Sequence, residues 1–290
     1  MRIAIYGRAL HESSRPFLKE LLDEIRTRKL SVIVHREFAG ELSGIGADGF
    51  DTFTGHNDIR EGTDCLFSLG GDGTLLDTVG LVRDSGIPVM GINFGRLGFL
   101  SSIGKEDVKD AITAIENGTY IVDERSLLRL ESSKPLFDQA AFALNEFTLH
   151  RKDTSSMIIV NAYLNGEFLN SYWADGIIVS TATGSTGYSL SCGGPVVLPN
   201  AESFIITPVA PHNLNIRPLV VPDDSVISFE IEGRGGSYLC TLDSRAETID
   251  SSYQLAVKKE AFKMNLVRLG ERNFLTTLRN KLHWGIDSRT

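Results

Sequence analysis

The stretch Gly70-Gly71-Asp72-Gly73-Thr74 constrains the fold of this chain more than any other. It follows an apolar run, residues 65–69, and it precedes residues at helical spacing from Leu75 onward. An apolar run, a glycine turn and a helical pattern predict a buried strand, a tight loop and a helix N-terminus. Glycine adopts backbone angles that other residues resist, and a helix N-terminus offers free N–H donors, so this loop suits a phosphate group. We expect Thr74 to cap the helix.

Asp72 is the unexpected member of this loop, because a carboxylate opposes the binding of phosphate. Its presence indicates a second task. It could orient a hydroxyl nucleophile and take its proton, or hold Mg²⁺ through water. Asp-Gly also occurs in ordinary turns, where the side chain makes local hydrogen bonds. The complete string behind a buried strand favours the chemical role.

The first 121 residues alternate between strand-like and helix-like patterns, whereas residues 40–62 predict a loop with at most one short element. This alternation predicts a doubly wound α/β domain over residues 1–121, with a parallel sheet whose ligands bind at the carboxyl ends of the strands. The loop of residues 93–100 leaves the same edge as the glycine loop, so both should face one crevice. Phe99 could stack on a flat ring there or belong to the core.

The pattern changes after Tyr120, where short alternating or β-branched runs follow one another with turns between them. These runs predict an antiparallel β domain over residues 122–262. Residues 274–284 regain helical spacing, so we expect residues 263–290 to form a C-terminal helical tail that docks on the α/β domain. The expected strands of the β domain are residues 127–130, 141–149, 157–164, 176–180, 203–208, 225–232, 238–242 and 253–257.

Two polar groups in the predicted β domain are candidates for a binding site. Asn145-Glu146 interrupts an apolar strand, where polar side chains need partners; a satisfied pair at a strand edge and a ligand site both stay open. Asp175 precedes a strand that ends in a row of hydroxyls and glycines, residues 181–187, followed by Tyr188. Such a row offers donors and acceptors to ribose, phosphate and amide groups without adding charge.

Composition narrows the class of protein. With 290 residues and 42% hydrophobic content, the chain can bury a large core, and we expect two domains. A net charge of −8 argues against a nucleic-acid partner or an anionic membrane surface. The three cysteines lie far apart without paired Cys or His spacing, which indicates a reducing compartment. No stretch approaches the roughly 18 apolar residues of a membrane span, so we expect a cytoplasmic protein.

Taken in order along residues 60–285, the motifs of this chain resemble those of the NAD kinases. The glycine string alone is weak evidence, because diacylglycerol kinases and phosphofructokinases carry similar strings, but the ordered set is specific. The matching stretches are 70–74, 91–100, 145–146, 175–188, 193–195, 211–212 and 217–220.

The resemblance implies transfer of the γ-phosphoryl group of ATP, with Mg²⁺ carried by the nucleotide, to the 2′-hydroxyl of the adenosine ribose of NAD. It also implies a homodimer or homotetramer and a catalytic base at Asp72. ATP phosphates would then be bound by Gly70, Gly71, Gly73 and Thr74. NAD would be bound by Asp72, Gly73, Phe99, Asn145, Glu146, Asp175, Thr183, Thr186, Gly187 and Tyr188.

The chain departs from the family pattern at several positions. Ala182 stands where the family usually has Pro, and Gly187 where it usually has Ala. Asp243-Ser244-Arg245 replaces an Asp-Gly-Gln turn, so no role is transferred there, and Trp173 leaves a preference for NAD or NADH open. Two rival functions stay open: a lipid kinase of the diacylglycerol type and a nucleotide-binding sensor without turnover.

Overall fold

The computed structural model describes residues 1–9, 11–45, 49–138, 140–152, 157–232, 236–270 and 273–285. The chain divides into two compact units. Unit 1 comprises Met1–Glu124 and Met264–Thr290, and unit 2 comprises Arg125–Lys263. The chain passes from unit 1 to unit 2 along β7 (Ile121–Ser132) and returns along β18 (Gln254–Arg268).

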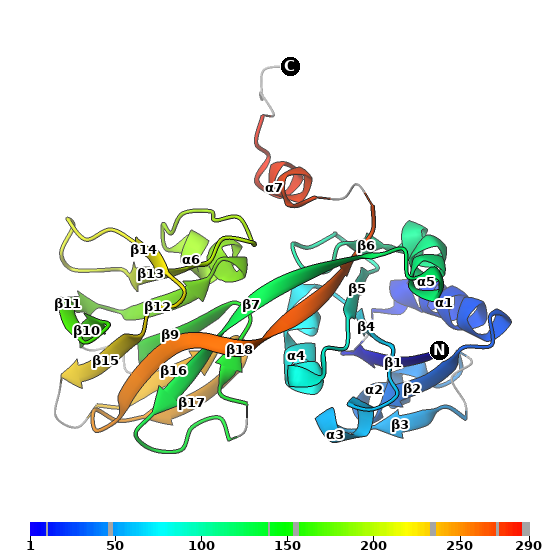
Figure 1. Cartoon of the computed structure of the whole chain (residues 1–290), viewed down its shortest axis with the longest axis horizontal. Helices are drawn as coiled ribbons and strands as arrows, with labels where there is room; N and C mark the ends of the chain where they lie inside the picture. Colours follow the sequence, from blue (N-terminus) through cyan, green and yellow to red (C-terminus); the bar gives the residue numbers. More distant parts are fainter. Residues whose placement is uncertain are drawn as a thin grey trace. The chain divides into compact units, whose positions relative to one another are not determined.

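Unit 1 is built around a parallel sheet with the strand order β5-β4-β1-β2-β3 (Figure 1). The returning strand β18 adds to β5 in parallel, with Leu266 opposite Val89. The doubly wound α/β fold predicted for this region is confirmed. Its strands are β1 (Arg2–Gly7), β2 (Ser31–His35), β3 (Asp51–Phe53), β4 (Cys65–Leu69), β5 (Val89–Asn93) and β6 (Ile103–Gly104).

Helices cover both faces of this sheet, with α1 and α5 on one face and α3 and α4 on the other (Figure 1). Helix α1 carries apolar residues at helical spacing, and its Leu18, Leu21, Leu22 and Ile25 are fully buried. The C-terminal helix α7, which the tail pattern predicted, belongs to unit 1. The helices are α1 (Arg15–Thr27), α2 (Arg36–Ala39), α3 (His56–Ile59), α4 (Asp72–Val82), α5 (Val108–Asn117) and α7 (Phe274–Leu282).

The prediction of a loop over residues 40–62 was wrong. This stretch contains a 3₁₀ turn at Gly40–Leu42, the edge strand β3 and the short helix α3. Elements of three or four residues are too short to show a hydrophobic period. The start of α3 depends instead on a local contact, because the Asp58 carboxylate accepts hydrogen bonds from the backbone N–H of Thr54 and Gly55. Residues 46–48 lie outside the described residues.

Unit 2 consists of antiparallel strands in two sheets, as predicted for this region. One sheet has the order β14-β13-β12-β9-β16-β17, and the other contains β11-β10-β15-β18. The strands not yet given are β8 (Phe142–Ala143), β9 (Glu146–Arg151), β10 (Ile158–Leu164), β11 (Glu167–Ala174), β12 (Gly176–Thr181), β13 (Ser203–Val209), β14 (Leu219–Pro222), β15 (Ile227–Glu232), β16 (Tyr238–Leu242) and β17 (Arg245–Ile249).

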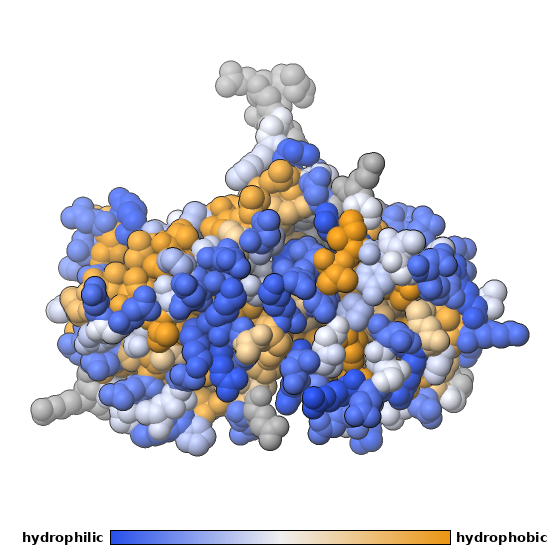
Figure 2. All heavy atoms as spheres, in the orientation of Figure 1, coloured by the Kyte–Doolittle hydropathy of each residue, from blue (hydrophilic) through white to orange (hydrophobic). Residues whose placement is uncertain are grey.

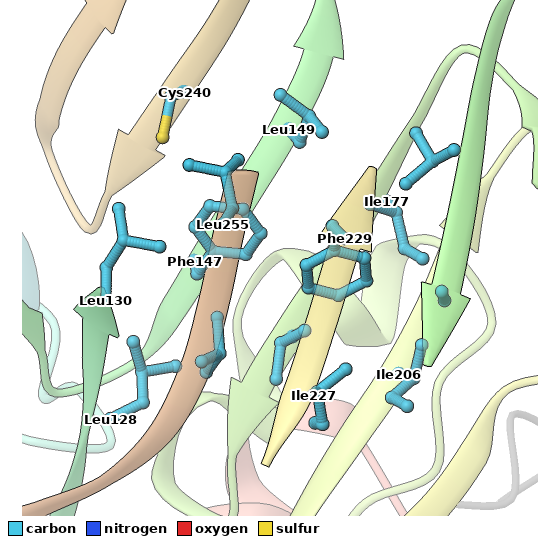
Figure 3. Packing of buried hydrophobic residues seen from close by; sticks show 14 of the residues in the cluster. Leu128, Leu130, Phe147, Leu149, Ile177, Ile206, Ile227, Phe229, Cys240 and Leu255 are labelled. Carbon is cyan, nitrogen blue, oxygen red and sulfur yellow. The ribbon is translucent and has the colours of Figure 1, made fainter. Parts of the chain in front are cut away.

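The core of unit 2 lies between these two sheets (Figure 3). Phe147 of β9 stacks on Phe229 of β15, with ring centroids 5.7 Å apart and an interplanar angle of 20°. Leu149, Ile177 and Leu255 pack around this pair, and all are at most 2% exposed. Because alternate side chains of a strand face the core, the alternating pattern of the sequence was a reliable guide here.

Two details of unit 2 differ from the prediction. The strand expected over residues 141–149 is divided into β8 and β9, because the N–H groups between them bond to a carboxylate instead of a neighbouring strand. The hydroxyl-rich row contains a 3₁₀ turn, η5 (Thr183–Thr186), and one helical turn, α6 (Tyr188–Ser191), which the sequence analysis did not predict.

Among the described residues, no helix has the length and apolar character needed to cross a membrane.

Candidate active site

The glycine loop of unit 1 connects the end of β4 to the start of α4. Of its three glycines, only Gly70 has a positive φ, +152°, and a Cβ there would lie 2.4 Å from the Thr74 hydroxyl oxygen. The Gly71 carbonyl accepts from the N–H groups of Thr74 and Leu75, so the helix begins at Asp72. The prediction that Thr74 caps α4 was therefore wrong, since Thr74 lies buried inside the first turn.

Asp72, the first residue of α4, directs its carboxylate to a different loop. Its Oδ2 accepts the N–H of Phe99 at 2.8 Å, and its Oδ1 accepts those of Leu100 at 3.0 Å and Ser101 at 2.8 Å. The sequence analysis expected both loops at one sheet edge, and these bonds join them directly. A carboxylate has acceptor sites for about four hydrogen bonds, so Oδ2 keeps room for one further donor.

The loop that Asp72 holds is also fixed at its start. The Asn93 side chain donates to the carbonyl of Arg96 at 2.6 Å and accepts from the N–H of Gly95 at 2.9 Å. Phe99 further along this loop packs against Phe274 of α7, with ring centroids 5.9 Å apart. Both aromatic rings belong to unit 1 and both are half-buried.

A charged group lies behind the glycine loop, at the carboxyl end of β1. Asp77 of α4 forms an ion pair with Arg8 at 2.6 Å and accepts a hydrogen bond from the Tyr6 hydroxyl at 2.9 Å. Burial, together with the neighbouring Asp77, raises the pKa of Tyr6 to about 12. Arg8 is thus engaged by a carboxylate of its own unit.

In unit 2, Asn145 and Glu146 lie at the gap between β8 and β9. The carboxylate of Asp243 accepts the N–H groups of Leu144 at 2.8 Å, Asn145 at 2.9 Å and Glu146 at 3.0 Å. The Asn145 side-chain oxygen is buried and has no hydrogen-bond partner among the described residues. A buried amide oxygen without a hydrogen-bond partner destabilises a protein, so this atom is suited to accept a hydrogen bond from a ligand.

Glu146 is unusual for an acidic residue. Its pKa is raised to about 7, first by burial and then by the negative charge of Asp243, while a hydrogen bond from the Tyr188 N–H at 3.3 Å opposes the shift. The pKa of Asp243 is also raised, because its carboxylate is buried, although the residue as a whole is half-buried. The three N–H donors and the positive charge of Arg245 lower this pKa and so oppose the shift.

The hydroxyl-rich row of η5 and α6 packs directly on this gap. A Cβ at Gly184 would lie 2.1 Å from the Asn145 carbonyl oxygen, so only glycine permits the two segments to approach this closely. Arg125, which is buried, donates to the Thr183 hydroxyl at 3.3 Å, and the Thr186 hydroxyl donates to the Thr183 carbonyl at 3.4 Å. Thr183 and Thr186 therefore belong to the same cluster as Asn145 and Glu146.

Asp175 and Tyr188 flank the ring of His150. Tyr188 stacks on His150 with ring centroids 5.6 Å apart, and Asp175 forms an ion pair with Arg151 at 3.2 Å. Burial lowers the pKa of His150, and the nearby Asp175 opposes that shift. Tyr188 keeps 39% of its surface exposed, so one part of its ring stays accessible to a ligand.

Each unit thus brings together its own share of the predicted site residues. Unit 1 groups Asp72 and the glycine loop with the Phe99 loop; unit 2 groups Asn145, Glu146 and the segment from Thr183 to Tyr188, with Asp175 next to His150. The sequence analysis missed Asp243. The only signal was an Asp at the usual place in an altered turn, and no role was transferred to it.

Comparison with known proteins agrees with this arrangement. Residues 3–120 match the model of the ATP-NAD kinase N-terminal domain, and residues 144–269 match that of the C-terminal domain. A curated NAD kinase from Cytophaga hutchinsonii is 48% identical over 292 residues, and one from Bacteroides fragilis is 36% identical over 292 residues. Both alignments cover 100% of this chain and 100% of the relative.

Solved structures give the same assignment for the fold. A yeast NADH kinase complexed with NADH has a TM-score of 0.85 at 24% identity, covering 99% of this chain and 88% of that one. An NAD kinase from Archaeoglobus fulgidus in complex with ATP has a TM-score of 0.75 at 26% identity, covering 98% and 99%. With both family models matched along the chain and full-length relatives well above 30% identity, the chain belongs to the NAD kinase family.

Proposed function

We propose that this chain transfers the γ-phosphoryl group of ATP to the 2′-hydroxyl of the adenosine ribose of NAD, which yields NADP and ADP. The observation that carries this proposal is the Asp72 carboxylate, which is fixed at a glycine loop and whose Oδ2 accepts one hydrogen bond, from the Phe99 N–H, among the described residues. A fixed carboxylate beside a phosphate-binding loop is the arrangement that orients a hydroxyl for attack on phosphorus.

In the proposed reaction, the ribose 2′-oxygen bonds to the γ-phosphorus while the bond from that phosphorus to the ADP oxygen breaks. The hydroxyl donates a hydrogen bond to Oδ2 of Asp72, which receives its proton and passes it to solvent. Phosphoryl transfer requires little covalent help from a protein, so accurate positioning of this hydroxyl supplies most of what Asp72 contributes.

The remaining candidate residues are proposed to bind the substrates. Backbone N–H groups of Gly71 and Gly73, at the N-terminus of α4, would contact the phosphates of ATP, because the first N–H groups of a helix have no acceptor within it. Thr74 and Gly70 shape this turn. In unit 2, the unpartnered Asn145 oxygen would accept from the adenosine part of NAD, with hydroxyls of Thr183 and Thr186, and Tyr188 and Asp175, around the dinucleotide.

A divalent cation, Mg²⁺, is proposed to arrive with ATP. Among the described residues, no group of three or more His, Cys, Asp or Glu side chains is placed to hold a metal ion. The donors of the glycine loop are N–H groups, which suit phosphate oxygens and not a cation. We propose that the nucleotide holds the cation, which would neutralise phosphate charge there.

The decisive experiment incubates purified protein with ATP, Mg²⁺ and either NAD or NADH, and measures NADP with an NADP-specific dehydrogenase after oxidising any NADPH. We expect NADP to form with time and enzyme concentration. The family assignment disfavours the lipid kinase alternative, and parallel incubation with diacylglycerol tests it directly. Phosphorylated lipid without NADP, or nucleotide binding without any product, would overturn the proposed function.

We also propose that the chain forms homo-oligomers in the cytoplasm. Support comes from the edge strand β14, where Leu219 and Val220 are exposed, and from the nearby Leu214, which is 82% exposed. Figure 2 shows apolar residues gathered over this part of unit 2, at the upper left of the view.

Light scattering tests this assembly. It should give a mass of two or four chains, and the double substitution Leu219→Asp with Val220→Asp should reduce that mass. A parent protein that scatters as a single chain at micromolar concentration would refute the assembly.

A further inference from the structure

One hairpin of unit 2 binds a segment that lies 105 residues earlier in the chain, counted from Arg245 to Ala140. We call this segment, residues 137–146, the strap; residue 139 lies outside the described residues. The strap ends in Asn145 and Glu146, the proposed contacts to NAD. Its partners are three side chains of the β16–β17 hairpin, spaced two residues apart: Asp243, Arg245 and Glu247.

The spacing of these three residues explains why they act on the same segment. Alternate side chains of a strand lie on the same face, so Arg245 and Glu247 of β17 both reach the strap, whereas Ala246 between them is exposed. Glu247 accepts the N–H of Phe137 at 2.5 Å, at the start of the strap. Asp243, in the turn, accepts the N–H groups at its end. Arg245 binds the part in between.

Arg245 makes two kinds of contact with the middle of the strap. Its guanidinium donates to the backbone carbonyls of Ala140 and Phe142, which lie two residues apart. It also lies over the rings of Phe137 and Phe142, 6.0 and 5.6 Å from their centroids. A guanidinium is a planar cation with five N–H donors in a fork, whereas the charge and the donors of Lys share one nitrogen. The combination of two hydrogen bonds with two ring contacts therefore suits arginine.

The strap depends on such contacts because part of its own backbone is unfavourable. Phe137 and Asp138 have positive φ angles of +55° and +45°, in the left-handed region that residues with a Cβ rarely adopt. Regular strand pairing covers the short β8, Phe142 and Ala143, in the middle of the strap. The observed path of the backbone is thus stable only with the support of surrounding groups.

The hold of Arg245 on the strap bears directly on Asn145. The Asn145 amide oxygen is buried and has no hydrogen-bond partner among the described residues, so the backbone on either side sets its position. Arg245 binds the carbonyl of Phe142, three residues earlier, and Asp243 binds the N–H of Asn145 itself. The positive charge of Arg245 also lowers the pKa of Asp243, which favours the ionised form that accepts these N–H groups.

We propose that Arg245 is a positioning residue for the dinucleotide, which holds the middle of the strap and thereby sets where Asn145 presents its amide oxygen. The identification of the ligand as NAD rests on the proposed function. Arg245 stands in the altered turn, where the family pattern has Gln. A Gln side chain is uncharged and carries its donors on one nitrogen, so the contacts of Arg245 are a feature of this chain.

The test compares Arg245→Met with Glu247→Met as a matched control. Arg245→Met removes every donor from the middle of the strap, whereas Glu247→Met leaves the N–H of Phe137 without its acceptor at the far end. We expect Kd for NAD, measured by calorimetry, to rise roughly tenfold in Arg245→Met, as it would if about one tenth of the molecules kept the strap in place. In Glu247→Met it should rise less than about twofold. Saturating NAD selects the binding conformation, so kcat should change little in either variant.

Two further measurements separate positioning from a general loss of stability. Both variants should lower the urea midpoint of unfolding, because each leaves a backbone group without its partner. Hydrogen exchange should become faster over residues 142–146 in Arg245→Met, and near residue 137 in Glu247→Met. If Arg245→Met does not fold, Arg245→Lys takes its place; it keeps the charge but loses the fork, and should raise Kd roughly threefold.

The inference would be overturned by equal rises of Kd in the two methionine variants, or by a parent-like Kd in an Arg245 variant whose strap exchanges faster. A fall in kcat without a change of Kd would also overturn it. A parent that binds NAD but makes no NADP would refute the proposed function, whereas calorimetry would still decide the role of Arg245.

Discussion

Asp72 in unit 1 and Asp243 in unit 2 make the same kind of contact in different surroundings. Each carboxylate accepts three consecutive backbone N–H groups, those of residues 99–101 for Asp72 and those of residues 144–146 for Asp243. In both units the segment held in this way carries proposed substrate-binding residues, Phe99 in one and Asn145 in the other. In each segment one carboxylate thus accepts backbone N–H groups that would otherwise need another acceptor.

The two sites differ in what else surrounds the carboxylate. Asp72 starts a helix that follows a glycine loop, and its Oδ2 accepts the N–H of Phe99 while its Oδ1 accepts those of Leu100 and Ser101. Asp243 lies in the turn between β16 and β17, beside Glu146 and Arg245, and burial raises its pKa. The comparison teaches that the same hydrogen-bond pattern occurs in two different surroundings, and we propose that it supports chemistry at Asp72 and stability at Asp243.

The largest effect is expected for Asp72→Asn. We predict a loss in kcat of roughly 10²-fold or more, because the amide cannot take the hydroxyl proton and presents N–H groups to the loop. NAD binding, measured by calorimetry, should be largely retained. Asp110→Asn, which removes an exposed carboxylate from the first turn of α5, is the control. Turnover at the parent rate would remove Asp72 from the mechanism without affecting the family assignment.

Asp243→Asn should reduce stability more than it reduces kcat. The substitution weakens charge-assisted bonds to three N–H groups, so the free energy of unfolding should fall by about 3 kcal/mol in urea denaturation. Because Asn145 loses its support, KM for NAD should rise while kcat changes less. Asp224→Asn, an exposed carboxylate of the same unit, should leave both quantities unchanged. A loss of kcat as large as that of Asp72→Asn, without loss of stability, would contradict the division of roles.

The pKa of Glu146 predicts a pH dependence. Because its folded pKa of about 7 lies above its ordinary value of 4.5, the folded protein binds more protons between these values, and stability should fall as pH rises from about 4.5 to about 7. After allowance for partial solvent access, the contribution is about 2 kcal/mol. Urea denaturation across this range should show a flatter profile for Glu146→Gln than for Glu167→Gln, an exposed control on β11. Equal slopes would show that Glu146 does not carry the effect.

The smallest effect concerns Gly187, where the family usually has Ala. A Cβ there would lie 3.1 Å from the Glu146 carboxylate and 3.2 Å from the Gly184 carbonyl oxygen, and the φ of −92° lies outside the left-handed region. We expect Gly187→Ala to change stability by less than about 0.5 kcal/mol, since the lower entropy of the unfolded chain offsets the tighter contact. KM for NAD should change less than twofold. A larger change in KM would show that space beside Glu146 is needed by the substrate.

The sequence predicted the helices and strands whose residues show a clear hydrophobic period. The apolar run before Gly70 and the spacing after it gave β4 and α4, and alternation gave most strands of unit 2. Thr74 was misplaced because the Gly71 carbonyl starts the helix earlier than a side-chain cap would. The helical turn at Tyr188 was missed because four residues do not establish a period.

Such local patterns could not predict the hydrogen bonds that organise the candidate site. Asp243 and Asn145 are 98 residues apart, and side-chain bonds to a distant backbone leave no periodic signal. The sequence did mark Asn145-Glu146 as candidates, because this pair interrupts an apolar strand. It could not show that Phe99 faces Phe274, since that contact joins a loop to a helix at the other end of the chain.

The return of the chain along β18 has a consequence for synthesis. Since Val89 of β5 pairs with Leu266, the parallel sheet of unit 1 gains its last strand only after all of unit 2 has left the ribosome. Until β18 has been synthesised, one edge of the sheet in the nascent α/β region stays without its last strand. Premature termination within unit 2 would leave that edge open to aggregation, so the α/β domain completes its sheet only after the β domain has been synthesised.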